Sequence, residues 1–191
     1  MGKGQIILLN GVSSAGKTSL AKVLQAYLDE PFFMLGTDMF QCEMIPEKFT
    51  NPRNINYSHD IHLRLYLDAM SGFHHTIKSF SDMGLHTVVD HVFLKGHKTF
   101  DECVKLLNEY PVLFVHVTCP IDELQRREKE RKNRFIGQAE EQIPQLYPQD
   151  TYDISVDTYD NSLEECAKKI IERLKSPEKC EAFKNLWMKC T

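Results

Sequence analysis

Residues 11–18, GVSSAGKT, constrain the fold and the chemistry of this chain more than any other stretch. They fit the pattern G-x-x-x-x-G-K-[ST], in which a loop between a strand and a helix surrounds phosphate groups. An apolar run over residues 5–10 precedes the loop, and apolar residues at helical spacing follow it. This strand–loop–helix context separates a phosphate-binding loop (P-loop) from a chance glycine–serine turn. The sequence therefore predicts a nucleoside triphosphate-binding site.

The residue types of the P-loop meet the needs of a phosphate site. Gly11 and Gly16 can adopt backbone angles that other residues avoid, so the loop N–H groups can turn inward as an anion-binding nest at a helix start. Lys17 can reach the terminal phosphates, and the Thr18 hydroxyl can bind Mg²⁺. The implied cofactors are a nucleoside triphosphate and Mg²⁺, and the motif does not distinguish ATP from GTP. The predicted nucleotide-binding residues of the loop are Gly11, Ser13, Ser14, Ala15, Gly16, Lys17, Thr18 and Ser19.

Two aspartates are expected where strands end. Asp38 follows the short apolar run over residues 32–35, and Asp90 lies near the end of an expected strand over residues 86–93. In open α/β sheets, ligands bind at the carboxyl edge of the strands. Asp38 can accept a substrate hydroxyl proton beside the γ-phosphate or cap the next helix. Asp90 can hold Mg²⁺ through water or cap its strand. His91 beside it can face this site or the opposite side of the sheet.

Three arginines, Arg127, Arg131 and Arg134, recur at spacings of four and three and therefore share one helical face. Such a run is either a solvated charged helix or a lid over the nucleotide. A P-loop in the same chain favours a lid over about residues 126–142, because guanidinium groups there would neutralise phosphate charge and help to exclude water. Arg127 is assigned to nucleotide binding. The candidate catalytic residues are Asp38, Lys17, Arg131 and Arg134, and the candidate metal ligands are Thr18 and Asp90.

The order of the expected elements predicts the fold class. Strands alternate with helices along the chain, which favours a parallel sheet with helices on both faces. We expect a three-layer α/β P-loop fold with five parallel strands, similar to nucleoside monophosphate kinases. With 191 residues, one well-cored domain is the default. A kinase domain over residues 1–175 is expected, followed by a helical tail over 176–191 that packs on the domain or forms an oligomer interface.

Composition narrows the partners. The net charge of −4 gives no basic field for nucleic acid or an anionic membrane. No apolar run reaches the length that spans a bilayer, and no secretory signal is expected at the start of the sequence. The six cysteines lack zinc-site spacing and are expected to be free thiols. We therefore expect a cytoplasmic protein without a nucleic-acid or membrane partner.

The chain resembles the chloramphenicol phosphotransferase family over about residues 5–175. The likeness rests on the sequences of four stretches: residues 7–17 (ILLNGVSSAGK), 35–38 (LGTD), 88–94 (VVDHVFL) and 153–158 (DISVDT). The region of the three arginines also matches, through Gly137, Ala139 and Gln142. Two stretches depart from the family pattern: Asp90 is followed by a histidine instead of a second acid, and residues 45–58 do not resemble the antibiotic-binding version.

The resemblance implies an ATP- and Mg²⁺-dependent kinase that transfers the γ-phosphoryl group to a small-molecule hydroxyl. Asp38 would then be the general base, Lys17 and the lid arginines would stabilise the transferred group, and Mg²⁺ would lie on Thr18. Two alternatives stay open. The chain could be a nucleotide-binding regulatory switch without a small-molecule acceptor, or a kinase for a sugar, a nucleotide or a macromolecule.

Overall fold

The central strands form because they are apolar almost throughout, as strands covered on both faces require. A computed structural model describes residues 2–46, 49, 59–96, 98–130 and 136–190. Its five strands form one sheet in the order β2-β3-β1-β4-β5, and every pairing between neighbours is parallel. The predicted five-stranded parallel sheet is confirmed. The strands are β1 (Ile6–Asn10), β2 (Phe32–Gly36), β3 (His86–His91), β4 (Val112–Thr118) and β5 (Ile154–Asp157).

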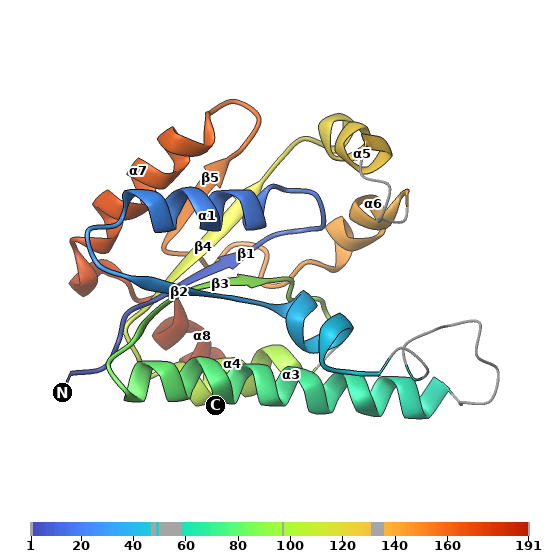
Figure 1. Ribbon diagram of the computed structural model, residues 1–191, viewed down its shortest axis with the longest axis horizontal. Helices are drawn as coiled ribbons and strands as arrows, with labels where there is room; N and C mark the ends of the chain where they lie inside the picture. The colour runs from blue at the N-terminus through green and yellow to red at the C-terminus, as the bar shows by residue number, and fades with distance from the viewer. Residues whose placement is uncertain (1, 47–48, 50–58, 97, 131–135, 191) are drawn as a thin grey trace.

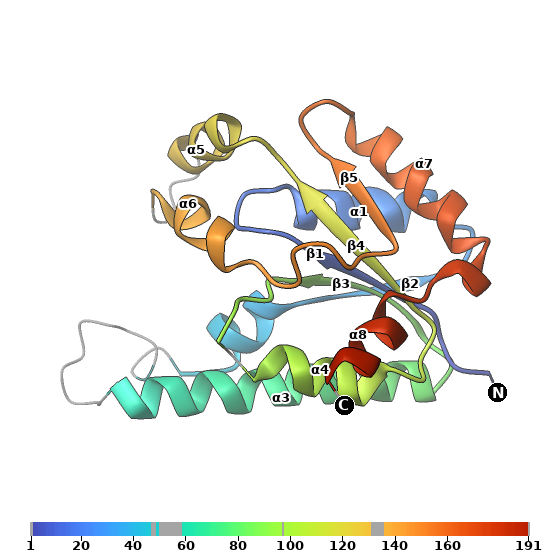
Figure 2. The ribbon, with the colours of Figure 1, turned by 180° about the vertical axis from the view of Figure 1, so that it is seen from behind.

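Helices cover both faces of the sheet (Figures 1 and 2). One face carries α1 (Lys17–Tyr27) and α7 (Leu163–Leu174), and the other carries α3 (His59–Asp82), α4 (Thr99–Leu107) and α8 (Ala182–Cys190). Because successive strand side chains point to opposite faces, β1 supplies both cores: Ile7 and Leu9 join one, Ile6 and Leu8 the other. The predicted three-layer arrangement is confirmed. Within the described residues, no helix is long and apolar enough to cross a membrane.

The shorter elements gather where the strands end. η1 (Met39–Glu43) follows β2, and α5 (Ile121–Glu130) follows β4. Figure 1 shows η1, α5 and α6 (Gln138–Gln142) on the side of the molecule where β1 gives way to the P-loop. Two single turns complete the described elements, η2 (Ile143–Gln145) and η3 (Pro177–Lys179). The carboxyl edge of the sheet is therefore the edge surrounded by loops and short helices.

Asn10 fixes the end of β1 immediately before the P-loop. Its side chain is fully buried, and its amide nitrogen donates to the Tyr147 carbonyl (3.0 Å) and the Tyr152 hydroxyl (2.8 Å). Its amide oxygen accepts from the Phe93 N–H (2.9 Å). A buried amide keeps its place only when such groups are satisfied. Asn10 thus holds together β1, the residues after β3 and the segment that leads to β5.

The C-terminal helix belongs to the second core. Ala182, Phe183 and Leu186 of α8 are buried in the cluster that includes Phe114 of β4. The Asp153 carboxylate joins the two elements, since it accepts from the N–H groups of Phe114 (2.8 Å), Glu181 (2.8 Å) and Ala182 (2.9 Å). Burial raises the pKa of Asp153, although these N–H groups favour its charged form. The described apolar face of α8 is used within the chain.

Four cysteines, Cys103, Cys119, Cys166 and Cys180, are free thiols in the structure. Burial is the main cause that raises the pKa of each. A raised pKa lowers the fraction of reactive thiolate, so these cysteines have structural surroundings and not those of nucleophiles. The side chains of Cys42 and Cys190 lie outside the described part of the chain.

Candidate active site

The P-loop joins the end of β1 to the first residue of α1. Gly16, directly before the helix, has a left-handed backbone with φ +93°, where a side chain would be strained. At Gly11 the requirement is space, because a Cβ atom would lie 2.4 Å from the Val117 carbonyl oxygen of β4. Both glycines of the motif are therefore demanded by the backbone that shapes the loop.

Two polar groups of the loop point to a ligand. The hydroxyl oxygens of Ser13 and Ser14 are buried and have no hydrogen-bond partner among the described residues. A buried hydroxyl without a partner is costly, and such groups in native structures call for a physical explanation. Phosphate oxygens accept hydrogen bonds from hydroxyl and N–H groups, and the N–H groups at the start of α1 lie in the same loop. The unsatisfied hydroxyls fit a bound triphosphate.

Lys17, Thr18 and Asp90 converge beneath the P-loop. The Lys17 ammonium donates to the Val12 carbonyl (3.0 Å) and lies 3.6 Å from an Asp90 carboxylate oxygen. The Thr18 hydroxyl donates to the other Asp90 oxygen (2.5 Å). Strand register explains the meeting, because Asp90 of β3 lies opposite Leu9 of β1, close to the start of the loop.

The same residues fit Mg²⁺. A hydroxyl and a carboxylate are hard oxygen donors, and Mg²⁺ in nucleotide sites commonly uses one or two such groups together with phosphate oxygens and water. Thr18 and Asp90 are already in contact, and α1 and β3 supply them from separate elements. Among the described residues, no three His, Cys, Asp or Glu side chains gather as a metal site. The oxygen donors and the contact between Thr18 and Asp90 give this predicted ligand pair suitable chemistry and a suitable position for Mg²⁺.

Asp38 lies at the same edge of the sheet, just after the neighbouring strand β2. Gly36, the last residue of β2, pairs with Asp90, so the chain reaches Asp38 two residues beyond the level of that carboxylate. The side chain is exposed. Asp38 precedes η1 but makes no capping hydrogen bond with its side chain. The structure thus gives no support to the alternative that Asp38 is present to cap the following turn.

Arg127 reaches the P-loop from α5. Its guanidinium donates to the hydroxyl (3.0 Å) and the carbonyl (3.0 Å) of Thr158, and its Nε donates to Glu123 (2.8 Å). A Cβ atom added to Gly16 would lie 3.5 Å from the same guanidinium. Arg127 therefore lies beside the start of α1, on the P-loop side of its helix. Arg131 and Arg134 lie outside the described residues, so their place in a lid stays a prediction.

The sequence alone predicts no role for two further residues near the site. Glu128 is 1% exposed, and its carboxylate accepts from the N–H groups of Gly137 (2.8 Å) and Ala139 (2.7 Å) at the start of α6. Gln142, at the end of α6, accepts from the Ser13 N–H (2.7 Å). Glu128 is one acid in a charged run, and Gln142 is one position of a family likeness. The contacts that give these residues importance exist only in the folded chain.

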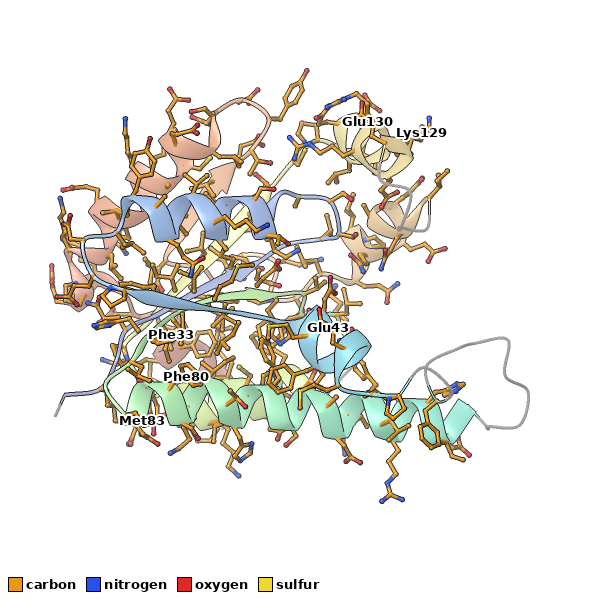
Figure 3. The ribbon with its side chains drawn as sticks, in the orientation of Figure 1. Phe33, Glu43, Phe80, Met83, Lys129 and Glu130 are labelled. Atoms are coloured by element: carbon orange, nitrogen blue, oxygen red, sulfur yellow. The ribbon has the colours of Figure 1, made fainter. Side chains whose placement is uncertain are left out.

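We expect Glu128→Gln to destabilise the protein by about 1–3 kcal/mol, because an amide offers one acceptor oxygen where the buried carboxylate satisfies two N–H groups. Unfolding in urea, followed by circular dichroism, measures the change. Glu130→Gln is the matched control: this residue lies on the same helix (Figure 3) with its side chain 62% exposed, so a change within about 0.5 kcal/mol is expected. Equal losses in the two variants would contradict a special role for the Glu128 carboxylate.

His91 points away from the phosphate side of the sheet. Asp90 and His91 are adjacent in β3 and so face opposite sides. His91 is buried with His74 of α3, their Nε2 atoms lie 2.9 Å apart, and Phe93 stacks on the His91 ring. Burial lowers the pKa of both histidines, that of His74 to about 4. The pair is a neutral element of the core.

This neutral pair predicts that stability falls with acidification. The unfolded histidine has a pKa near 6.5 and His74 in the folded chain about 4, so between these values only the unfolded chain takes up the proton. Stability from this source is fully present above pH 6.5 and is lost as pH falls towards about 4. The glutamine in the variant His74→Gln cannot titrate. Between pH 7.5 and 5, the unfolding free energy of this variant should therefore fall by about 2 kcal/mol less than that of the wild type. Parallel pH dependences in urea unfolding would refute the prediction.

Comparison with known proteins gives the family. A family model described as chloramphenicol phosphotransferase-like protein matches residues 4–175. A Mycobacterium tuberculosis protein (strain H37Rv), provisionally named an O-phosphotransferase, is 29% identical over an alignment that covers 97% of this chain and 89% of that protein.

Solved structures show the same fold at low identity. The APS kinase of Mycobacterium tuberculosis, in complex with AMPPNP and APS, has a TM-score of 0.66 at 16% identity over 92% of this chain and 100% of that one. The shikimate kinase of Acinetobacter baumannii, in complex with shikimate, has a TM-score of 0.61 at 17% identity over 91% and 94%. Family and fold together support a P-loop kinase of small molecules. The chain belongs to the chloramphenicol phosphotransferase-like family.

Proposed function

We propose that this protein transfers the γ-phosphoryl group of ATP, with Mg²⁺, to a hydroxyl group of a small molecule. The observation that carries the proposal is the convergence of Lys17, Thr18 and Asp90 under a loop with unsatisfied serine hydroxyls. Asp38 lies at the same edge of the sheet, two residues beyond the end of β2. Together these groups supply a phosphate cradle, a cation, a metal-ligand pair and a base.

The phosphate groups would lie in the P-loop. The N–H groups at the start of α1 and the Ser13 and Ser14 hydroxyls donate to phosphate oxygens, and the Lys17 ammonium offsets the charge of the terminal phosphates. Thr18 and Asp90 would hold Mg²⁺, which supplies further charge neutralisation and orientation when bound. Little covalent chemistry is asked of the protein, since phosphoryl transfer depends chiefly on positioning and charge stabilisation.

Asp38 would activate the acceptor. The acceptor oxygen forms a bond to the γ-phosphorus while the bond from that phosphorus to the β–γ bridging oxygen breaks, and ADP leaves. The proton of the hydroxyl passes to the Asp38 carboxylate. An exposed carboxylate can approach a substrate hydroxyl, as a general base must.

The turn that follows Asp38 is fixed on α3. Phe40 of η1 packs on Phe73 of α3, with ring centroids 4.9 Å apart, and the Gln41 amide donates to the Met70 sulfur (3.4 Å). These contacts fix η1 directly after Asp38 and would therefore help to position the base towards an acceptor site. Most of residues 45–58, expected to line that site, lie outside the described part of the chain.

The test is ADP release from Mg·ATP across a panel of hydroxylated small molecules that includes chloramphenicol, shikimate and gluconate, with Asp38→Asn as the control. Strong stimulation by one compound, lost in Asp38→Asn, would establish the reaction and its acceptor together. Stimulation by chloramphenicol would identify an antibiotic kinase. Tight binding of Mg·ATP with no stimulation by any compound would count against a kinase for these acceptors and favour a nucleotide-dependent switch.

A further inference from the structure

The peptide group between Val12 and Ser13 is held from both sides. Its carbonyl oxygen accepts from the Lys17 ammonium at 3.0 Å, and its N–H donates to the Gln142 side-chain oxygen at 2.7 Å. The C=O and N–H of one trans peptide lie in a plane and point in opposite directions. The Ala15 N–H also donates to this carbonyl (3.3 Å). The side chain that fixes the direction of the Ser13 N–H therefore helps to fix the direction of the carbonyl that receives Lys17.

Gln142 is itself held in place. It ends α6, a helix whose first N–H groups are bound by the buried Glu128 carboxylate. Ala139, one turn earlier, is fully buried in the same core cluster as Val12. The Gln142 amide thus projects from a short helix that is fastened to α5 and to the core, and its oxygen meets the P-loop from the side opposite to Lys17.

The direction of this carbonyl has a consequence for Lys17. The ammonium lies within hydrogen-bonding distance of Val12 but 3.6 Å from the Asp90 carboxylate. Hydrogen bonds between charged groups are shorter than 3 Å, so the ammonium is not drawn fully onto Asp90. If the peptide turned, Lys17 would lose its carbonyl acceptor and the carboxylate would attract it more closely. An ammonium paired tightly with Asp90 is less able to contact phosphate.

We propose that Gln142 is a positioning residue for Lys17. It holds the Val12–Ser13 peptide in the orientation that keeps the ammonium available to the terminal phosphates. This inference rests on the proposed function, because it assumes that Lys17 binds the phosphates of ATP. Gln142 acts through the peptide, which lies between its amide and Lys17.

The test measures the affinity of Mg·ATP by titration calorimetry, without an acceptor. Gln142→Met keeps the length of the side chain but removes the acceptor of the Ser13 N–H. The affinity is expected to fall about 3- to 10-fold, as expected for the loss of one hydrogen bond. Gln145→Met is the matched control, since this nearby side chain is bonded to the Glu141 carbonyl on the exposed side of η2; its affinity should equal that of the wild type. Gln142→Leu also removes the acceptor of the Ser13 N–H, and the same loss of affinity is expected.

A double-mutant cycle separates positioning from a general disturbance of the loop. If Gln142 acts through Lys17, then Gln142→Met should cause no further loss of affinity in a Lys17→Met background. Equal fold losses in the two backgrounds would overturn the inference, as would an unchanged affinity in Gln142→Met while the wild type binds Mg·ATP. Either result leaves the kinase proposal intact. A wild-type chain that binds no Mg·ATP would overturn both proposals.

Discussion

Asp38→Asn is expected to lower phosphoryl transfer about 10²-fold or more, the usual effect of losing a general base, while the affinity for Mg·ATP stays close to that of the wild type. The amide has nearly the same shape as the carboxylate but cannot accept the hydroxyl proton. Asp38 follows β2, whereas the described phosphate-site contacts come from the P-loop, α1 and β3. Turnover with the best acceptor of the panel and calorimetric titration of Mg·ATP measure the two quantities.

The control for this prediction is Glu43→Gln. Glu43 is an exposed acid at the end of η1, the turn that begins after Asp38 (Figure 3), and its replacement removes one negative charge from the same part of the surface. Wild-type turnover is expected. If both variants lost activity to the same extent, the effect would come from the charge of the region. If Asp38→Asn kept full turnover, Asp38 would not be the base.

The sheet and the phosphate side of the site could be predicted because they depend on local patterns. Residues 5–10 and 112–117 are apolar runs of strand length, and the glycines and lysine of the P-loop mark their own positions. Asp90 could be placed because carboxyl ends of parallel strands meet at one edge. The register confirms that placement, since Asp90 pairs with Leu9. Each of these signals lies within a few residues of the feature that it predicts.

The remaining features depend on contacts between distant residues. His91 could not be assigned to a face until β3 was placed against α3, where His74 meets it. Glu128 looks like any solvated acid in its charged run, yet the return of the chain at Gly137 buries it. Gln142 is 129 positions from Ser13 in the sequence. Single-residue patterns carry no information on such pairs. Neither the burial of the Glu128 carboxylate nor the contact of Gln142 with the Val12–Ser13 peptide could therefore be predicted.

Among the single variants proposed, Lys17→Met is expected to give the largest loss of turnover and of affinity for Mg·ATP. The methionine keeps much of the apolar stem, which is buried, but removes the charge that would face the terminal phosphates. The loss of one preorganised charged donor lowers turnover by about 10²- to 10³-fold. The affinity for Mg·ATP should also fall, by about 10-fold or more, because hydrogen bonds to charged groups are stronger than neutral ones. Turnover and calorimetry, as for Asp38, measure both.

Asp38→Asn and Lys17→Met should affect different quantities, and this difference tests whether the two residues have separate roles in the site. Asp38→Asn should change turnover alone, whereas Lys17→Met should change nucleotide affinity as well, because Lys17 would contact phosphate before and during transfer. Lys17→Met also leaves Asp90 without its nearby ammonium, so part of its effect passes through the Asp90–Thr18 pair. Combining Lys17→Met with Asp90→Asn measures that part. A double variant no worse than Lys17→Met alone would show that these residues act as one unit, and normal kinetics in Lys17→Met would contradict the P-loop assignment itself.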